Sequence, residues 1–453
     1  MPRHIRQLYR LFRPALGAAA AVAIFAAGIS AAWSEGLYPL GETTGVPRLS
    51  DKPLPYKVVP ERPELFIELG CKFLGRGNLP KGITLPTGAV WTPCLWGFGT
   101  FRTAFQTYEA VGAPGRNTEI ATRLDLFLNL QLTSTEKCIL GIAPLDSNRF
   151  TNFTRYSFES NQGLEGGQSE LGVYLRTAFC EGDFGSLFPN LDPLGTKLID
   201  YGFSFGRQQI TFQEGIMIND TLDAIGLVRN NLHAPGFSNI RITGLAAVDH
   251  IDRGTPANRR RLNAPLFLGL FVQTDTTAST WAFDFITVQD DSTNSTGGDG
   301  YYFGLAAIQR GWNPFNGIGT FNTAYRINAS YGEGSDTPQL SDGVLLSAEV
   351  SWTPHSSDDV VYVNPFWGIN RYSQAGREPI VGGPLAALGI SFASPSLGNH
   401  LSELSSFNTQ VVGAAIGYQA FWDQHRRNLV LELAGVKDTT RGFFDTDGPG
   451  TDA

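Results

Sequence analysis

Residues 124–132 read LDLFLNLQL, and this short stretch decides the fold class. Leucine occupies every second position, and the positions between the leucines hold Asp125, Phe127, Asn129 and Gln131. Successive side chains of a β-strand point to opposite faces of a sheet, so this period of two puts all the leucines on one face. The stretch is therefore predicted to be a strand with one apolar face and one wetted face.

The same alternation recurs along the chain after residue 63. It is clearest in ELFIELGCKF (64–73), SELGVYLRTAF (169–179), TFNTAYRINASY (320–331) and VLLSAEVSW (344–352). A soluble β-sandwich buries its apolar faces against each other. An outer-membrane β-barrel instead turns the apolar faces to lipid and the polar faces into a wet lumen. Both classes of protein produce this pattern.

Three features favour the barrel. The alternating segments are longer than the roughly five or six residues usual in soluble sheets. Aromatic residues gather towards the strand ends, as Trp281, Tyr301, Tyr331, Trp352 and Trp422. No apolar run after the N-terminal segment is long enough for a helical span. The fold class predicted is all-β, a transmembrane antiparallel β-barrel of about 16–18 strands.

Connection lengths give the predicted strand count. Short connections lie near residues 134, 277, 354–357 and 423–427, and long ones, expected to be external, at 76–93, 147–166, 290–299, 332–342 and 374–407. About fifteen strands are clear, and alternation of short and long connections needs two weak ones, near 82–92 and within 210–229. An even count requires one more strand.

The N-terminus reads as a targeting segment. Four arginines precede an apolar run from Ala15 to Ile29 and a small-residue cleavage site, so residues 1–34 are predicted to be a signal peptide. An uncleaved inner-membrane anchor is the alternative. Residues 35–62 are Pro-rich and are predicted to be a periplasmic arm, with a disordered linker as the alternative. Residues 63–453 are predicted to form the barrel, located in the bacterial outer membrane.

Charge and cysteine content narrow the function. The net charge is −8 and becomes −12 once the four signal-peptide arginines are removed, which argues against nucleic-acid binding. Cys71, Cys94, Cys138 and Cys180 form no CxxC pair, so a metal site is not expected. Disulfides in an oxidising compartment and small apolar fillers both remain open.

Enzyme chemistry is not expected. No HExxH sequence is present, and the adjacent pair Asp249 and His250 is more typical of a solvated strand end than of a catalytic site. The acidic loops 289–300 and 445–452 lack the closing Glu of an EF-hand, and solvated loops are the better interpretation. We expect no cofactor.

The stretch GRQQITFQEGIMIND, residues 206–220, begins a connection that is both charged and apolar. An external loop of this composition would expose too much apolar surface. Part of residues 210–237 is therefore predicted to complete the wall and part to fold into the lumen. Apposed acids and bases would then form a constriction. The predicted pore-lining residues are Lys72, Arg123, Asp125, Glu170, Arg176, Arg207, Gln208, Glu214, Asp220, Asp223, Arg229, Arg326 and Glu349. Structural ion pairing that only holds the loop is the alternative.

Two segments resemble the alginate export porin family. The first is GRQQITFQEGIMINDTLDAIGLVRNN (206–231), in which the residues that carry the resemblance are Gly206-Arg207-Gln208, Glu214-Gly215 and Asp220. The second is ATRLDLFLNLQLTSTEKCILGIAPLD (121–146). The resemblance implies a monomeric outer-membrane barrel of eighteen strands that exports an acidic polysaccharide. This sequence departs from the family in its four cysteines and in a lumen of mixed charge.

The function predicted is a channel that passes small hydrophilic solutes or oligosaccharides. One alternative is an exporter of an acidic polysaccharide such as alginate, acting with a periplasmic assembly. The other is a structural or adhesive surface barrel without an open pore. The expected partners are outer-membrane lipid, lipopolysaccharide and the diffusing solute.

The C-terminus does not end on the aromatic strand residue usual for such barrels. Residues 445–453 are acidic and rich in glycine, like an external loop. We expect either a fragment or a very short closing strand over residues 438–444.

Overall fold

The computed structural model describes residues 64–440, apart from 75–81, 111–112, 147–152, 162, 164, 198, 250, 254–261, 263–264, 291–297, 314–317, 334–339, 356, 379–380, 395–396, 399, 401–407 and 423–426. The predicted signal peptide and arm (1–62), His250, the middle of loop 289–300 and residues 441–453 lie outside the described residues.

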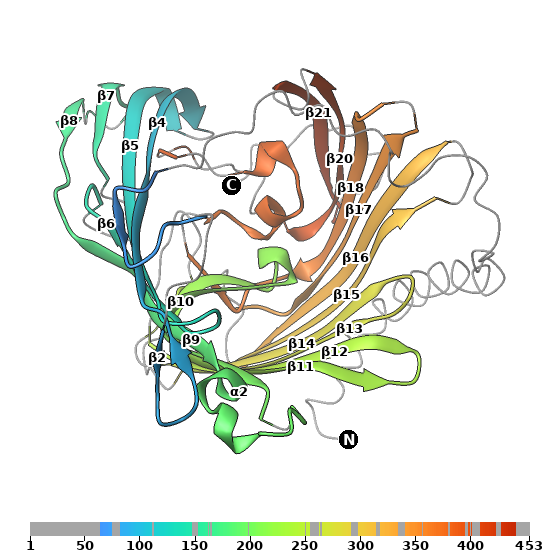
Figure 1. Cartoon of the computed structure of the whole chain (residues 1–453). Coiled ribbons are helices and arrows are strands. Elements are labelled where there is room, and N and C mark those ends of the chain that lie inside the picture. Colours follow the sequence, from blue (N-terminus) through green and yellow to red (C-terminus); the bar gives the residue numbers. More distant parts are fainter. Residues whose placement is uncertain are drawn as a thin grey trace. The chain divides into compact units, whose positions relative to one another are not determined.

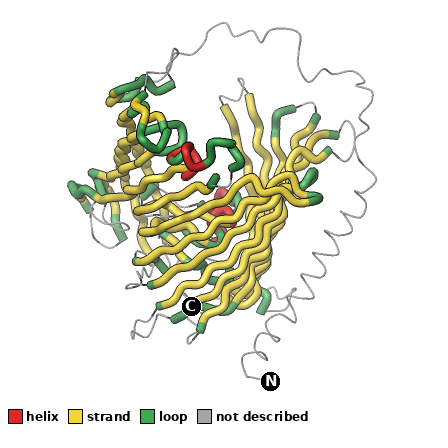
Figure 2. Tube along the Cα trace, turned by 60° about the horizontal axis from the view of Figure 1, so that its bottom comes forward, coloured by secondary structure: helices red, strands yellow, loops and turns green. Residues whose placement is uncertain are grey.

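The predicted all-β, antiparallel fold is confirmed. Among the residues that the structure describes, nineteen strands belong to one sheet, which curves strongly around the segments inside it (Figures 1 and 2). They are β1 (Ile67–Leu69), β4 (Cys94–Ala110), β5 (Ala113–Gln131), β6 (Lys137–Ala143), β7 (Arg155–Glu159), β8 (Gly166–Gln168), β9 (Tyr174–Asp183), β10 (Tyr201–Phe212), β11 (Ile218–Ala234), β12 (Phe237–Val248), β13 (Leu266–Asp275), β14 (Thr280–Gln289), β15 (Gly300–Trp312), β16 (Gly319–Gly332), β17 (Gly343–Pro354), β18 (Val360–Arg371), β19 (Gly376–Arg377), β20 (Thr409–Trp422) and β21 (Arg427–Asp438).

Hydrogen bonding joins most of these strands into a continuous antiparallel series, here called the wall. It runs β1, β4, β5, β6, β9, then β10 to β18 in order, then β20 and β21. The three other strands are additions: β7 and β8 pair beside one end of β5, and β19 pairs in parallel with β11. Nineteen strands less these three leaves sixteen in the wall.

Most strand predictions hold, but the strand expected over 64–73 is only three residues long, Ile67–Leu69. The weak strand expected within 210–229 is β11. The weak strand expected near 82–92 is wrong as a wall strand, because β2 (Ile83–Thr84) and β3 (Val90–Trp91) form a separate two-stranded sheet. The connection at 147–166 contains β7, which the sequence did not indicate.

The sheet of the described residues is not closed. One end is β21, paired with β20, and the other is the β1–β4 pair. The structure describes only residues 438–440 of the closing strand expected over 438–444, and the rest of that segment lies outside the described residues.

The two ends of the wall differ as predicted. Connections of a few residues, such as 235–236 between β11 and β12 and 276–279 between β13 and β14, lie at one end, here called the short-turn end. The long connections 290–299, 333–342 and 372–408 lie at the other end. Three short helices, α2 (Phe184–Leu187), η1 (Pro189–Leu191) and η2 (Gln213–Gly215), interrupt the early connections.

Side-chain burial follows the alternation in LDLFLNLQL. Asp125 is buried on the concave face of the sheet, whereas Leu130, one of the leucines on the other face, is exposed. The same holds on β16, where Arg326 and Asn328 are buried. In the part of the chain that the structure describes, no helix has both the length and the apolar character needed to span a bilayer.

All four cysteines are in disulfides, Cys71 with Cys94 and Cys138 with Cys180. The second pair joins residues directly opposite each other on β6 and β9. Both bonds lie towards the short-turn end, and both fit an oxidising compartment. The alternative of unpaired small fillers is therefore wrong.

We expect alkylation of the denatured, unreduced protein to add no label, and alkylation after reduction to label all four cysteines. Intact mass spectrometry of protein purified from the cell envelope measures both states. Label on any cysteine before reduction would contradict the pairing.

Candidate functional site

The hairpin of β10 and β11 leaves the wall partway along its length. Pairing of β10 with β9 ends at Arg207, and pairing of β11 with β12 begins at Ala224. Gly206 lies at this departure with φ of +116°, and a Cβ there would lie 2.4 Å from the backbone oxygen of Ala178. Glycine alone tolerates this conformation and this close approach. Residues 208–223, here called the inward hairpin, pair with each other and with β19.

The inward hairpin packs on the concave face of the wall (Figure 1). The Phe212 ring stacks on Phe271 of β13, and the Gln213 amide donates to Asp284 of β14 at 2.5 Å. Met217 and Ile216 at the tip are completely buried. The prediction that part of residues 210–237 folds inward is confirmed, and it is the first half of this stretch that does so.

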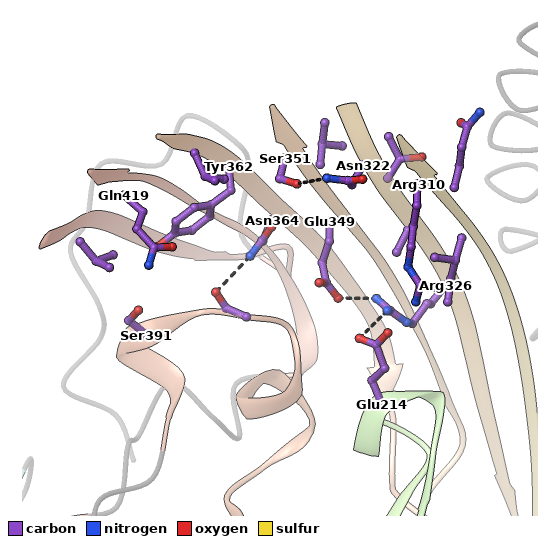
Figure 3. Close-up of a pocket in the computed structure, with 18 residues that line it drawn as sticks. Glu214, Arg310, Asn322, Arg326, Glu349, Ser351, Tyr362, Asn364, Ser391 and Gln419 are labelled. Carbon is purple, nitrogen blue, oxygen red and sulfur yellow. Dashed lines mark hydrogen bonds and ion pairs between the residues drawn. The ribbon is translucent and has the colours of Figure 1, made fainter. Parts of the chain in front are cut away.

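Glu214 at the tip of the hairpin reaches a charged pair on the wall. Its carboxylate lies 2.6 Å from an Nη of Arg326 on β16, and the same guanidinium donates to Glu349 of β17. The Arg326 side chain is 1% exposed, whereas that of Glu214 is 50% exposed. One buried cation thus holds two carboxylates, one from the wall and one from the hairpin (Figure 3).

A second segment also lies inside the sheet. Residues 372–393, here called the inner loop, carry the short helices η4 (Pro384–Ala387) and η5 (Ser391–Ala393) and are mostly buried. Tyr372 Oη donates to the Ile216 oxygen at 3.1 Å, and the Gln374 amide donates to the Gly215 oxygen at 2.7 Å. The prediction that 374–407 is an external loop is wrong for this part, because its apolar side chains pack against β17, β18 and β20.

The inner loop also pairs with the β11 arm of the inward hairpin, next to its tip. Arg377 of β19 pairs in register with Asn219. Burial lowers the pKa of Arg377 to about 10, and the nearby Asp220 carboxylate acts in the opposite direction. Asp220 is fully buried and accepts from the backbone N–H of Asp252 at 2.7 Å. These groups fasten the two inner segments to each other.

A third group of charges lies on the concave face of β4, β5 and β9. Asp125 is 2.8 Å from Arg102 and 2.7 Å from Arg176, and Arg176 is also 3.4 Å from Asp146. Arg123 is buried beside them, with its guanidinium over the Phe153 ring at 5.2 Å.

The other predicted pore-lining residues are scattered. Arg207 and Asp223 form an ion pair at 2.9 Å across the hairpin base, and buried Gln208 donates to the Ala224 oxygen. Arg229 lies towards the short-turn end, where it donates to the Lys197 and Asp200 oxygens. Lys72 is exposed and Glu170 half-buried. The structure thus joins Glu214, Arg326 and Glu349 in one group, and separately pairs Asp125 with Arg176 and Arg207 with Asp223.

A cavity of about 620 Å³ lies on the short-turn side of the inner segments. Polar side chains from β15 to β18 and β20 line it, with Glu214 of the hairpin and Ser391 of the inner loop closing the other side (Figure 3). Besides Arg326 and Glu349, the lining includes Arg310, Asn322, Ser351, Tyr362, Asn364 and Gln419.

The predicted site did not include these six residues, Arg102 or Asp146, although alternation places Asn322 and Ser351 on the same strand faces as Arg326 and Glu349. Alternation within 358–373 places Tyr362 and Asn364 on one face, so the pattern contained a signal for both. The remaining residues come from different strands, and only the folded wall brings them together. Among the described residues, no group of three or more His, Cys, Asp or Glu is placed to hold a metal ion.

Together these observations define a curved antiparallel sheet whose charged concave face holds two inward segments and a polar cavity. No protein-family model matches the sequence, and no curated protein matches it, so neither comparison supports the specific resemblance to alginate export porins. Among solved structures, the chain is similar to one titled "Crystal Structure of Pseudomonas aeruginosa OccK11 (OpdR)", an outer-membrane porin. The identity is 7% and the TM-score 0.41, over 76% of this chain and 79% of that chain.

We expect Arg326→Gln to destabilise the protein, because two carboxylates then face each other without a cation. Loss of one partner costs about 3 to 5 kcal/mol in a fully buried pair and about 1 kcal/mol or less in an exposed one. Because Glu214 is partly exposed, the cost of Arg326→Gln should lie between these two values. The urea midpoint of unfolding measures the change.

Arg102→Gln is the matched control, because Arg102 is 53% exposed and Asp125 keeps its contact with Arg176. We expect its midpoint to stay close to that of the native chain. Equal midpoints for the two variants would refute a special role for Arg326.

Proposed function

We propose that the chain is a bacterial outer-membrane channel for small hydrophilic solutes or oligosaccharides. The observation that carries this proposal is the Glu214–Arg326–Glu349 contact. It places a charged hairpin tip against the charged concave face of a wall whose opposite face exposes apolar side chains. In outer-membrane barrels the apolar face meets lipid and the polar face meets the aqueous lumen.

The inward hairpin acts as the constriction of this channel. Opposed acids and bases along a pore select among solutes by charge and by size. Short turns usually face the periplasm in such barrels, so the cavity would be reached from the periplasmic side. Export after signal-peptide cleavage would deliver the chain to the outer membrane, where lipid and lipopolysaccharide contact the wall.

Conductance of the purified full chain in planar lipid bilayers tests the proposal. We expect discrete open steps, whose ion selectivity shifts when the exposed lumen cation is removed by Arg102→Gln. Absence of open steps at all voltages and in the presence of solute would refute an open channel.

One observation favours a second candidate, a structural barrel without a pore. The inner loop and hairpin bury a substantial apolar cluster inside the sheet, including Ile216, Leu345, Tyr372 and Leu385. Such packing is typical of a permanent plug as well as of a narrowed pore. Export of an acidic polysaccharide with a periplasmic assembly is the further alternative, and block of open steps by an oligouronate alone would favour it.

A further inference from the structure

We propose that the 620 Å³ cavity is a binding subsite for an uncharged, hydroxyl-rich solute, that is, a unit of a neutral oligosaccharide. This inference rests on the proposed channel function and names the class of solute that its periplasmic side would hold. Cavities that bind small molecules have volumes of about 300 to 1,000 Å³, and this one lies within that range.

The charges around the cavity disfavour both charged classes of solute, because three carboxylates stand against two cations, Arg326 and Arg310. The Arg326 cation is already held by Glu214 and Glu349. The Glu432 carboxylate beside the cavity accepts from Tyr362 Oη at 2.6 Å and from the Ser391 N–H at 3.0 Å. An anionic sugar would approach three carboxylates, and a cationic one would compete with hydrogen bonds that are already made. A neutral solute meets neither obstacle.

Two lining side chains are available for hydrogen bonds. Within the described residues, neither the Arg310 guanidinium nor the Gln419 amide has a hydrogen bond or ion pair to another residue, and they lie on opposite sides of the cavity (Figure 3). A sugar hydroxyl both donates and accepts, so it can bind donors such as the guanidinium and a group such as the amide that offers both.

The remaining lining is held in place. The Asn364 amide nitrogen donates to the Leu388 oxygen at 2.9 Å and to the Gly389 oxygen at 3.1 Å, which leaves its Oδ1 as an acceptor. The Tyr362 ring is fixed through its hydroxyl and gives an apolar surface next to polar groups. Polar groups fixed in this way lose little conformational entropy when a ligand binds.

Calorimetric titration of the full chain in detergent tests the proposal. The probes are maltohexaose, cellohexaose and xylohexaose as neutral oligosaccharides, oligoguluronate as an anion and chitosan hexamer as a cation. We expect at least one neutral probe to bind, with an affinity unchanged between 50 and 500 mM salt, because screening acts on charges. Arg310→Ala and Gln419→Ala should each weaken that binding roughly three- to tenfold. Gln289→Ala, at the long-connection end of β14, should leave it unchanged.

The proposal fails if none of the neutral probes binds, or if both cavity variants bind as the native chain does. Binding of oligoguluronate alone, lost in Arg310→Ala, would also overturn it in favour of an anion site. The titration needs no conducting pore, so the two proposals can fail separately. Binding of a neutral probe without open steps would reject the channel and keep the subsite. Open steps without binding would reject the subsite and keep the channel.

Discussion

Replacing residues 210–220 with the dipeptide Asn-Gly should raise the single-channel conductance of the protein several-fold. The change removes the inward part of the β10–β11 hairpin and joins Gln209 to Thr221, which are already opposite each other in the ladder. Asn-Gly is the preferred two-residue connection in a β-hairpin, so the shortened strands should still pair. The wall keeps its pairing with β9 and β12, since both contacts lie outside the deleted part.

The conductance should rise because the hairpin occupies the lumen. Its tip contacts Asp284 on β14 and Arg326 on β16, and Met217 lies close to Gly304 on β15. Planar bilayer recording of the shortened and native proteins measures the step size. The shortened protein should also lose ion selectivity, because Glu214 is removed with the tip.

A control shortens the β7–β8 hairpin by deleting residues 158–165. This hairpin pairs beside one end of β5, away from the inward hairpin (Figure 1), so conductance should change little. Equal conductance in the native chain and the variant lacking 210–220, with a folded barrel in each, would show that the hairpin does not narrow the pore. A native chain without open steps whose shortened variant conducts would identify the hairpin as a plug.

Arginine on the lipid face should impair insertion far more than arginine on the concave face. Leu270 in the middle of β13 is 50% exposed on the outer surface of the wall. In a bilayer, an arginine at that depth costs about 2 to 4 kcal/mol, which corresponds to roughly 30- to 1,000-fold in the folding equilibrium. Leu270→Arg should therefore give a much smaller folded fraction in lipid vesicles.

Two variants complete this comparison. Leu270→Ala removes the leucine without adding charge and should fold almost as well as the native chain. Asn322→Arg adds the same cation beside the polar cavity, where water and carboxylates are near, and it too should insert. Heat-modifiable migration on gels measures the folded fraction. If Asn322→Arg lowered the folded fraction as much as Leu270→Arg, the assignment of one face of the wall to lipid and the other to water would be wrong.

The sequence alone determined most of the wall strands and the facing of their side chains. Alternation with a period of two is a local property of the extended backbone, and it is visible in LDLFLNLQL without knowledge of any neighbour. It placed Asp125 and Arg176 on one face, where they form an ion pair. It also showed that residues 206–220 are too apolar for a solvated loop, and the hairpin does fold inward.

Only the tertiary structure decided what fills the interior. The inner loop carries the same kind of apolar signal as the hairpin, in Leu385, Leu388 and Ile390, but those residues have no period that identifies their partners. Their partners on β17, β18 and β20 and in the hairpin are set by strand order and curvature, which are properties of the whole sheet.

The candidate site likewise has one property that the sequence determines, which side chains face inward, and one that only the fold determines, which of them meet. Glu214, Arg326 and Glu349 could each be recognised as polar positions of an amphipathic strand or connection. Their meeting depends on the turn at Gly206, whose positive φ sends the hairpin across the lumen. Arg310 and Gln419 became candidates only because distant strands bring them to one cavity. The sequence therefore determined which side chains face inward, because facing is local, and the fold determined which of them meet, because contact depends on long-range pairing.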